Sequence, residues 1–275
     1  MSLPRHAEAL DEASVMELGL AGARVLITGS SRGIGYSIAT AFLEEGADVV
    51  LTGRDVKDLR QARSSLAEEF GHLDVDAFAG DLGDPKVRLQ LHDRVAARGV
   101  DNLVCNVGSG QSVPILQETD EEWHRMLEIN LVQAAGMVRD MRGLLAASAT
   151  RGRGASMTFV GSICGLEALG CPLAYASAKA GLWAYARNLV RPLANDGIRV
   201  NQVSPGNVIF PGSTWETRLT QDSVGVQAML DREVAMRRLG TSKEVAAAVV
   251  FLASPRAAFV TGANLVVDGG QTRGL

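Results

Sequence analysis

Short apolar runs recur along the chain, and longer stretches with apolar residues three and four positions apart lie between them. Short runs rich in Val, Ile and Leu predict buried strands, whereas the wider spacing predicts helices. The runs predict strands at 23–28, 47–52, 75–79, 102–105, 155–160, 198–203 and 264–268. Because strands and helices alternate, we expect an α/β fold: a Rossmann-like, doubly wound, mostly parallel seven-stranded sheet with helices on both faces.

The pattern also divides the chain. Residues 1–20 carry several charges and no long apolar run, so we expect an N-terminal extension there and a single Rossmann-fold domain at 21–275. Residues 207–240 show the least regular pattern, with Pro and Gly followed by a mixed polar helical stretch. Since this segment follows the end of a strand, we expect it to form a lid over a substrate.

Composition narrows the possible partners. The chain has 275 residues, of which 47% are hydrophobic, and a formal net charge of −4. This acidic balance gives no reason to expect nucleic acid or an anionic membrane as a partner. No run approaches the length of about eighteen apolar residues that a membrane span needs.

The cysteines and histidines suggest neither cross-links nor a metal. Cys105, Cys164 and Cys171 are an odd number and include no CxxC pair. We therefore expect a reduced, cytoplasmic protein without a disulfide framework, in which Cys164 and Cys171 are packing residues. The four histidines are scattered, so no metal site is expected.

A glycine-rich loop follows the first predicted strand and opens a helix. Its sequence is Thr28-Gly29-Ser30-Ser31-Arg32-Gly33-Ile34-Gly35. Glycines let the backbone turn tightly and approach a phosphate, which the free N–H groups and dipole of a helix N-terminus favour. Strand, glycine loop and helix together predict a dinucleotide-binding site.

The end of the second strand bears on the choice of cofactor. An acidic residue there binds the ribose 2′-OH of NAD, and a basic one accommodates the 2′-phosphate of NADP. Gly53 and Arg54 end this strand, and Arg32 of the glycine loop is able to reach the same place. Asp55 is the competing residue, but it is equally well placed to cap the next helix. The pattern favours NADP(H) and leaves NAD(H) open.

Other polar and glycine residues follow the remaining strands. Carboxyl ends of parallel strands share one edge of the sheet, where ligands bind. The further residues expected to bind the cofactor there are Asp81, Leu82, Asn106, Gly108, Pro205, Gly206 and Val208. Asp81 has two interpretations, contact with the adenine or a cap on the helix near Pro85.

Tyr175 and Lys179 are four positions apart, so in a helix they share one face. A nearby ammonium favours the phenolate and lowers the pKa of the tyrosine from its ordinary value of about 10. The pair is then able to exchange a proton with a hydroxyl or carbonyl group near neutral pH. Asn130 lies near an apolar helix face, either in a polar network or exposed.

Residues 20–270 resemble the short-chain dehydrogenase/reductase family of the ordinary single-domain type, similar to its 3-oxoacyl-ACP reductase-like members. The loop at 28–35 resembles the family's TGxxxGIG motif. Asn130, Ser162, Tyr175 and Lys179 match its catalytic tetrad, and Ser162 precedes Tyr175 by the usual thirteen positions. The run 105–108 stands where the family usually has NNAG, and it departs at Cys105 and Val107.

The resemblance implies an NADP-dependent enzyme that interconverts a small-molecule carbonyl and a secondary alcohol by hydride transfer. Tyr175 would be the general acid/base and Ser162 would hydrogen-bond the reacting oxygen. Lys179 would lower the pKa of Tyr175 and bind the nicotinamide ribose, and Asn130 would anchor a water. The resemblance also implies a homotetramer or a dimer.

Two alternatives remain. One is an NAD-dependent dehydrogenase of a sugar or polyol, and the other is a non-catalytic dinucleotide-binding regulator, which only the altered loop at Cys105 and Val107 favours. A 3-oxoacyl thioester, a sugar or polyol, and a steroid-like or xenobiotic ketone all stay open as substrates.

Overall fold

Seven strands form one sheet in the computed structural model, which describes residues 17–152 and 154–274. The strand order is β3-β2-β1-β4-β5-β6-β9, and all pairings within this sheet are parallel. The strands are β1 (Arg24–Ile27), β2 (Asp48–Gly53), β3 (Val75–Ala79), β4 (Asn102–Cys105), β5 (Ala155–Val160), β6 (Ile198–Pro205) and β9 (Asn264–Val267). The predicted fold class is confirmed.

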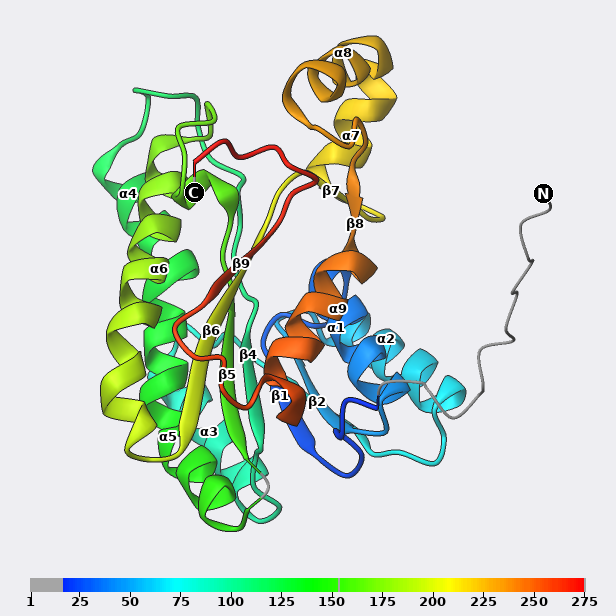
Figure 1. Cartoon of the computed structure of the whole chain (residues 1–275), viewed down its shortest axis with the longest axis vertical. Helices are drawn as coiled ribbons and strands as arrows, with labels where there is room; N and C mark the ends of the chain where they lie inside the picture. Colours follow the sequence, from blue (N-terminus) through cyan, green and yellow to red (C-terminus); the bar gives the residue numbers. More distant parts are fainter. Residues whose placement is uncertain (1–16, 153, 275) are drawn as a thin grey trace, which may run out of the picture.

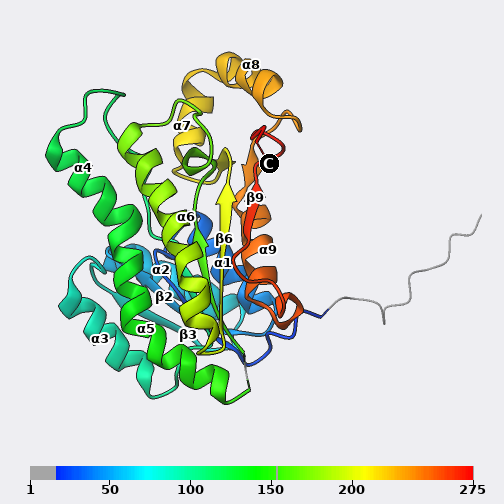
Figure 2. The same cartoon turned by 60° about the vertical axis from the view of Figure 1, so that its left-hand side comes forward.

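Helices cover both faces of the sheet (Figures 1 and 2). One face carries α1 (Gly33–Glu44), α2 (Val56–Glu69) and α9 (Ser242–Ala253), and the other carries α3 (Pro85–Ala96), α5 (Gln133–Thr150) and α6 (Leu173–Ala194). Side chains alternate along each strand, so Val25 and Ile27 of β1 join one apolar core while Leu26 joins the other. Both cores fix the sheet and leave its carboxyl edge free for a site.

The helical pattern at 120–147 is interrupted in the structure. Helix α4 (Asp120–Leu127) passes through a π-helical turn, η2 (Glu128–Val132), into α5. Asn130 lies in this turn and is buried. A single π turn inside a helix is frequent at functional sites, and it has no signature in the apolar spacing.

Residues 207–240 form a small unit of their own beyond the carboxyl ends of the strands (Figure 1). Two short strands that the pattern did not predict, β7 (Val208–Ile209) and β8 (Gly240–Thr241), pair in parallel at its base. Helices α7 (Thr214–Gln221) and α8 (Ser223–Glu233) lie between them. Val226, Leu230 and Val234 form a separate apolar cluster in this unit.

The start of the expected N-terminal extension, residues 1–16, lies outside the described residues. Its last residues pack on the fold: Leu20 is buried in a core, and the Arg256 Nε donates a hydrogen bond of 2.8 Å to the Glu17 carbonyl. Two 3₁₀ turns, η3 (Ile163–Gly165) and η4 (Pro255–Ala257), complete the fold. Within the described ranges, no helix combines the length and hydropathy that crossing a bilayer requires.

Candidate active site

The glycine loop brings the N-terminus of α1 against the end of β4. A Cβ on Gly35 would lie 2.2 Å from the Gly29 carbonyl oxygen, so only glycine fits at this position. Arg32 is the N-cap of α1, yet no side chain caps the helix and its first turn holds no acidic residue. The N-terminal N–H groups therefore remain available to an anion.

The altered loop after β4 still binds the glycine loop. The Thr28 Oγ1 accepts hydrogen bonds from the Asn106 N–H (2.8 Å) and the Val107 N–H (3.1 Å). In return, the Asn106 Nδ2 donates to the Thr28 carbonyl (3.0 Å) and the Gly29 carbonyl (2.9 Å). The departures at Cys105 and Val107 thus leave a connected set of hydrogen bonds between the two loops.

Two arginines lie at the end of β2 and in the glycine loop without a partner. Arg32 and Arg54 are exposed and line one cavity, and the side chain of neither makes an ion pair or hydrogen bond with another described residue. Asp55, the alternative ribose ligand, instead accepts a 2.8 Å hydrogen bond from the Asp58 N–H as the cap of α2. At the position that distinguishes NADP from NAD, this geometry leaves two cations unpaired among the described residues and gives the Asp55 carboxylate a role as a helix cap.

The two interpretations of Asp81 are also separated by the structure. Asp84, not Asp81, caps α3 by accepting a hydrogen bond from the Lys86 N–H. Asp81 lines the cavity, and its Oδ1 accepts a hydrogen bond of 2.9 Å from the Gly83 N–H. It therefore stays a candidate for contact with the adenine.

The four predicted catalytic residues come from three elements and converge. Ser162 follows β5, Tyr175 and Lys179 lie on α6, and Asn130 lies in η2. Ser162 hydrogen-bonds Tyr175. The Lys179 Nζ donates to the Val160 carbonyl at 2.9 Å and lies 6.0 Å from the centre of the Tyr175 ring. The carbonyl bond fixes the ammonium beside the tyrosine.

Asn130 is a network residue and not an exposed one. Its Oδ1 accepts from the Ser109 N–H (3.0 Å), and its Nδ2 donates to the carbonyls of Ser109 and Met126 (both 3.1 Å). A Cβ on Gly108 would lie 2.8 Å from the Asn130 Oδ1 and 3.0 Å from the Lys179 Nζ. Asn130 therefore holds the loop after β4 directly against Lys179.

The expected effect of Lys179 on Tyr175 needs correction. Burial raises the pKa of Tyr175 above its ordinary value, and the influence that opposes burial is the hydrogen bond with Ser162 rather than a charge on Lys179. Burial also lowers the pKa of Lys179 to about 8, which weakens its ammonium as a stabiliser of the phenolate. In this state Tyr175 is a protonated phenol.

A cavity of about 930 Å³ joins these groups. Most of the predicted site residues line it, including the glycine-loop residues Gly29, Arg32, Gly33, Ile34 and Gly35, the strand-end residues Arg54, Asp81, Asn106, Gly108, Pro205, Gly206 and Val208, and the catalytic residues Ser162, Tyr175 and Lys179. Three predicted residues do not line it: Ser31, Leu82 and Asn130. Leu82 is a core residue that packs with helices α3 and α5, so its side chain is not placed for a ligand.

The expectation that Cys164 and Cys171 are packing residues in a protein without disulfides is wrong. Cys164 and Cys171 form a disulfide with their Cα atoms 6.1 Å apart, and both line the cavity. Their loop leaves β5 and returns to α6, which brings positions seven residues apart together, and cysteine counting does not detect such a turn. Cys105 stays a free, buried thiol, and burial raises its pKa to about 12.

Several residues of the cavity carry no motif and are absent from the predicted site residues. They come from the loop after β4, helix α4, the loop before α6, the unit at 207–240 and the C-terminal tail, and they include Gln111, Arg125, Leu169, Trp215, Arg218 and Gln271. They form the part of the cavity beyond the catalytic residues. Their signal in sequence is only that they follow strand ends.

The fold is an open parallel sheet with a glycine loop. Unpaired cations and a Ser–Tyr–Lys group line the same cavity. Together these features define a dinucleotide-binding oxidoreductase.

Comparison with known proteins agrees. Residues 29–272 match a family model described as enoyl-(acyl carrier protein) reductase. The 3-oxoacyl-[acyl-carrier-protein] reductase of Vibrio harveyi is 32% identical over 256 residues, covering 92% of this chain and 99% of the relative. Its counterpart in Escherichia coli is 33% identical over 252 residues, covering 91% and 97%.

Solved structures lead to the same family. L-sorbose reductase from Gluconobacter frateurii, complexed with NADPH and L-sorbose, superposes with a TM-score of 0.87 at 32% identity, over 94% of this chain and 100% of that one. The chain belongs to the short-chain dehydrogenase/reductase family, as its motifs predicted, and is an NAD(P)-dependent oxidoreductase.

Proposed function

We propose that the protein reduces the carbonyl group of a small ketone to a secondary alcohol with NADPH, and catalyses the reverse oxidation with NADP⁺. One observation carries the proposal. A single cavity contains Ser162, Tyr175 and Lys179 in one part, and the unpaired arginines Arg32 and Arg54 in another. Groups that bind a phosphate and groups that transfer a proton therefore serve the same ligand-binding space.

The residues present fit NADP(H). The uncapped N-terminus of α1 suits the pyrophosphate, and Arg54 with Arg32 suits the 2′-phosphate as a planar donor fork. The relative from Gluconobacter frateurii was solved with NADPH, and so was an oxidoreductase from Pseudomonas aeruginosa at 29% identity. A related reductase from Brucella melitensis was solved with NAD, which keeps the NAD alternative under test. When bound, the cofactor supplies the hydride for the carbonyl carbon.

Tyr175 supplies the proton. As the carbonyl carbon gains a hydride, negative charge develops on its oxygen, and the Tyr175 hydroxyl donates its proton there. The raised pKa of Tyr175 keeps the phenol protonated before the reaction. One hydride and one proton convert the ketone to the alcohol, and the phenolate then recovers a proton from solvent.

The other three residues of the tetrad position the reacting groups and stabilise the charge that develops on the substrate oxygen. Ser162, already hydrogen-bonded with Tyr175, donates to the same substrate oxygen. Lys179, fixed by the Val160 carbonyl, binds the nicotinamide ribose and lies beside the phenolate that forms. The contacts of Asn130 with Ser109 support a positioning role for its side chain, and its predicted role as a water anchor stays a prediction.

Residues 207–240 serve as the lid of this site. Trp215 and Arg218 from α7 and Met229 from α8 line the cavity. The paired strands β7 and β8 hold the two ends of the unit together, and its apolar core is separate from those of the main fold. A unit attached in this way is able to move over the substrate without unfolding the sheet.

The altered loop at Cys105 and Val107 was the one feature that favoured a non-catalytic regulator. It no longer favours that alternative, because Asn106 and Thr28 keep this loop hydrogen-bonded to the glycine loop. The substrates of the relatives, a 3-oxoacyl chain on a carrier protein and L-sorbose, are both compatible with ketone reduction.

The test is NADPH oxidation with a panel of ketones. Tyr175→Phe removes the proton donor and should lower kcat by about 1,000-fold while NADPH binding persists. Tyr185→Phe is the matched control, since Tyr185 lies on the same helix, packs edge-on against Phe159 and does not line the cavity. NADPH binding without turnover of any ketone by the wild type would instead support the regulator.

A further inference from the structure

A glutamine near the C-terminus lines the cavity, and its side-chain oxygen is buried without a hydrogen-bond partner among the described residues. Gln271 follows β9 and is only 7% exposed, and it shares the cavity with Tyr175. Its Oε1 is buried and has no hydrogen-bond partner among the described residues. Arg24, Thr158 and Gln202 also carry such buried atoms, but none of them lines the cavity. A buried amide oxygen without a hydrogen-bond partner destabilises the fold unless a ligand supplies the missing hydrogen bond.

The backbone around Gln271 is fixed on both sides. Before it, the Asp268 carboxylate accepts hydrogen bonds from the Gly270 N–H (2.8 Å) and the Thr272 N–H (2.7 Å). After it, the Glu167 Oε1 accepts from the Arg273 N–H at 2.8 Å and from the Gly274 N–H. Glu167 belongs to the loop that also contains the disulfide. The tail is thus bound to the cavity wall, and the amide is positioned in advance.

The tail also contacts the lid. The Met236 N–H donates a 3.0 Å hydrogen bond to the Gly269 carbonyl, just after α8. Besides Gln271, the cavity is lined by apolar residues such as Leu169, Trp215 and Met229 and by polar ones such as Arg218 and Glu233. In a ligand pocket, a few fixed polar groups set the orientation and identity of the ligand. Gln271 is such a group.

We propose that Gln271 is a specificity-determining residue that hydrogen-bonds a hydroxyl group of the substrate. A hydroxyl both donates and accepts, so it pairs with either end of a glutamine amide, whereas an alkyl chain leaves that amide unsatisfied. The preferred substrate is therefore a hydroxylated ketone, and a saturated acyl or alkyl ketone is disfavoured. This inference rests on the proposed carbonyl reduction and names its substrate class.

The kinetic test compares ketoses of four to six carbons with straight-chain ketones of equal carbon number. The wild type should prefer the ketoses. Gln271→Met keeps the length of the side chain but removes the amide, and it should lower kcat/KM for ketoses by about 10- to 100-fold with little change for the alkyl ketones. Gln271→Asn keeps the amide and should retain part of the preference.

The matched control is Arg273→Ala. The Arg273 side chain is exposed and only its backbone N–H binds Glu167, so this variant should keep the wild-type preference. Thermal denaturation shows whether each variant folds. An equal loss for both ketone classes in Gln271→Met, or an unaltered preference for ketoses, would overturn the proposal.

A binding measurement separates the two proposals. Calorimetric titration of a ketose into the NADP⁺-loaded protein reports on Gln271 without turnover, and Gln271→Met should weaken this binding about tenfold. If no ketone is reduced yet ketose binding depends on Gln271, the proposed function fails and the hydroxyl site stands. If ketones are reduced but ketose binding is the same in both proteins, the hydroxyl site fails.

Discussion

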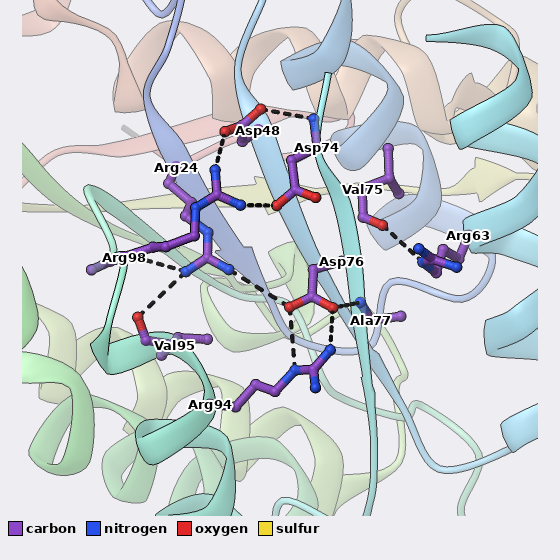
Figure 3. A network of polar contacts seen from close by, with 11 residues as sticks. Arg24, Asp48, Arg63, Asp74, Val75, Asp76, Ala77, Arg94, Val95 and Arg98 are labelled. Atoms are coloured by element: carbon purple, nitrogen blue, oxygen red, sulfur yellow. Dashed lines mark hydrogen bonds and ion pairs between the residues drawn. The ribbon is translucent and has the colours of Figure 1, made fainter. Parts of the chain in front are cut away.

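Arginines lie at both ends of the parallel sheet, in opposite surroundings. At the amino ends of β1, β2 and β3, Arg94 pairs with Asp76 at 2.8 Å, and Arg98 pairs with Asp48 at 2.7 Å (Figure 3). At the carboxyl ends, Arg32 and Arg54 line the cavity and have no carboxylate partner in the part of the chain that the structure describes. The side-chain type is the same, but Arg32 and Arg54 have no partner among the described residues, whereas Arg94 and Arg98 are paired with carboxylates.

Burial separates the two ends further. Arg24, 5% exposed, lies 3.6 Å from Asp76 and donates to the carbonyls of Val95 and Gly99. Burial acts to raise the pKa of Asp76, but hydrogen bonds from Arg94 and the Ala77 N–H outweigh it and keep that pKa below its ordinary value. Charges at the amino end are therefore compensated within the fold, whereas those at the carboxyl end are left for a ligand.

The largest effect is expected on catalysis, from substitution of Lys179, which is buried at the carboxyl end of the sheet. Lys179→Met should lower kcat/KM by about 1,000-fold, because it removes the charge beside the reacting oxygen. In the free wild type, kcat/KM for NADPH should fall above pH about 8, where Lys179 loses its proton. An alkaline fall that persists in Lys179→Met would assign this pKa to another group.

The lowered pKa of Lys179 also makes the free energy of unfolding depend on pH. The pKa of Lys179 is lowered in the folded state to about 8, so the fold disfavours the charged form. Between that pH and the unfolded value of about 10.4, the unfolded chain binds more protons, and the free energy of unfolding should rise with pH. Lys179→Met should remove this rise in urea titrations across the same range.

The second largest effect is expected on stability, from a substitution at the amino end of the sheet. Asp76→Ala leaves Arg24 buried without its carboxylate and should lower the free energy of unfolding by about 3 kcal/mol. Kinetic constants for NADPH should not change. Because the folded-state pKa of Asp76 is lowered, its contribution is present above pH about 4 and lost as pH falls through that lowered value.

Urea denaturation and steady-state kinetics on the same samples check this prediction. Asp93→Ala is the control, since Asp93 is 72% exposed and, among residues 17–152 and 154–274, pairs only with its neighbour His92; its effect should be small. A loss of NADPH affinity in Asp76→Ala would show that the two ends are not independent.

The smallest effect concerns the disulfide at the carboxyl end. It closes the loop between Ser162 and Tyr175, and the Cys164 N–H donates to the Ser162 Oγ. A dithiol reductant, itself oxidised to a disulfide, converts the pair to two thiols. The freed loop must then be ordered on binding, so KM for the ketone should rise about 3- to 10-fold with NADPH affinity unchanged.

A double variant, Cys164→Ser with Cys171→Ser, should show the higher KM and no response to the reductant. Thiol titration before and after reduction should show two new reactive groups, while the buried Cys105 stays unreactive. Identical KM values with and without reductant would remove the disulfide from the account of substrate binding.

Sequence was sufficient for the sheet because its strands are buried on both faces and read as continuous apolar runs, such as 23–28. The glycine loop and the tetrad were found because their chemistry fixes both residue type and spacing. Asp55 was ambiguous, since a helix cap and a ribose ligand need the same residue, and only the hydrogen bond to the Asp58 N–H separated them.

What sequence missed depends on tertiary geometry. The π turn at Asn130 and the pairing of β7 with β8 leave no periodic signal. The disulfide required a loop that returns on itself, and the pKa of Tyr175 depended on burial that a four-residue spacing does not report. Gln271 became visible only when its amide was found buried and unpaired.

The comparison between the two ends is tested most directly by measuring NADPH affinity and unfolding free energy for Arg54→Ala and Arg94→Ala side by side. Arg54→Ala should weaken NADPH binding by about 10- to 100-fold, leave NADH binding unchanged and alter stability by less than about 0.5 kcal/mol. Arg94→Ala, which breaks the pair with Asp76, should cost about 1 kcal/mol of stability and leave NADPH binding unchanged. Equal NADPH affinity in wild type and Arg54→Ala, with NADH bound more tightly than NADPH, would contradict the account.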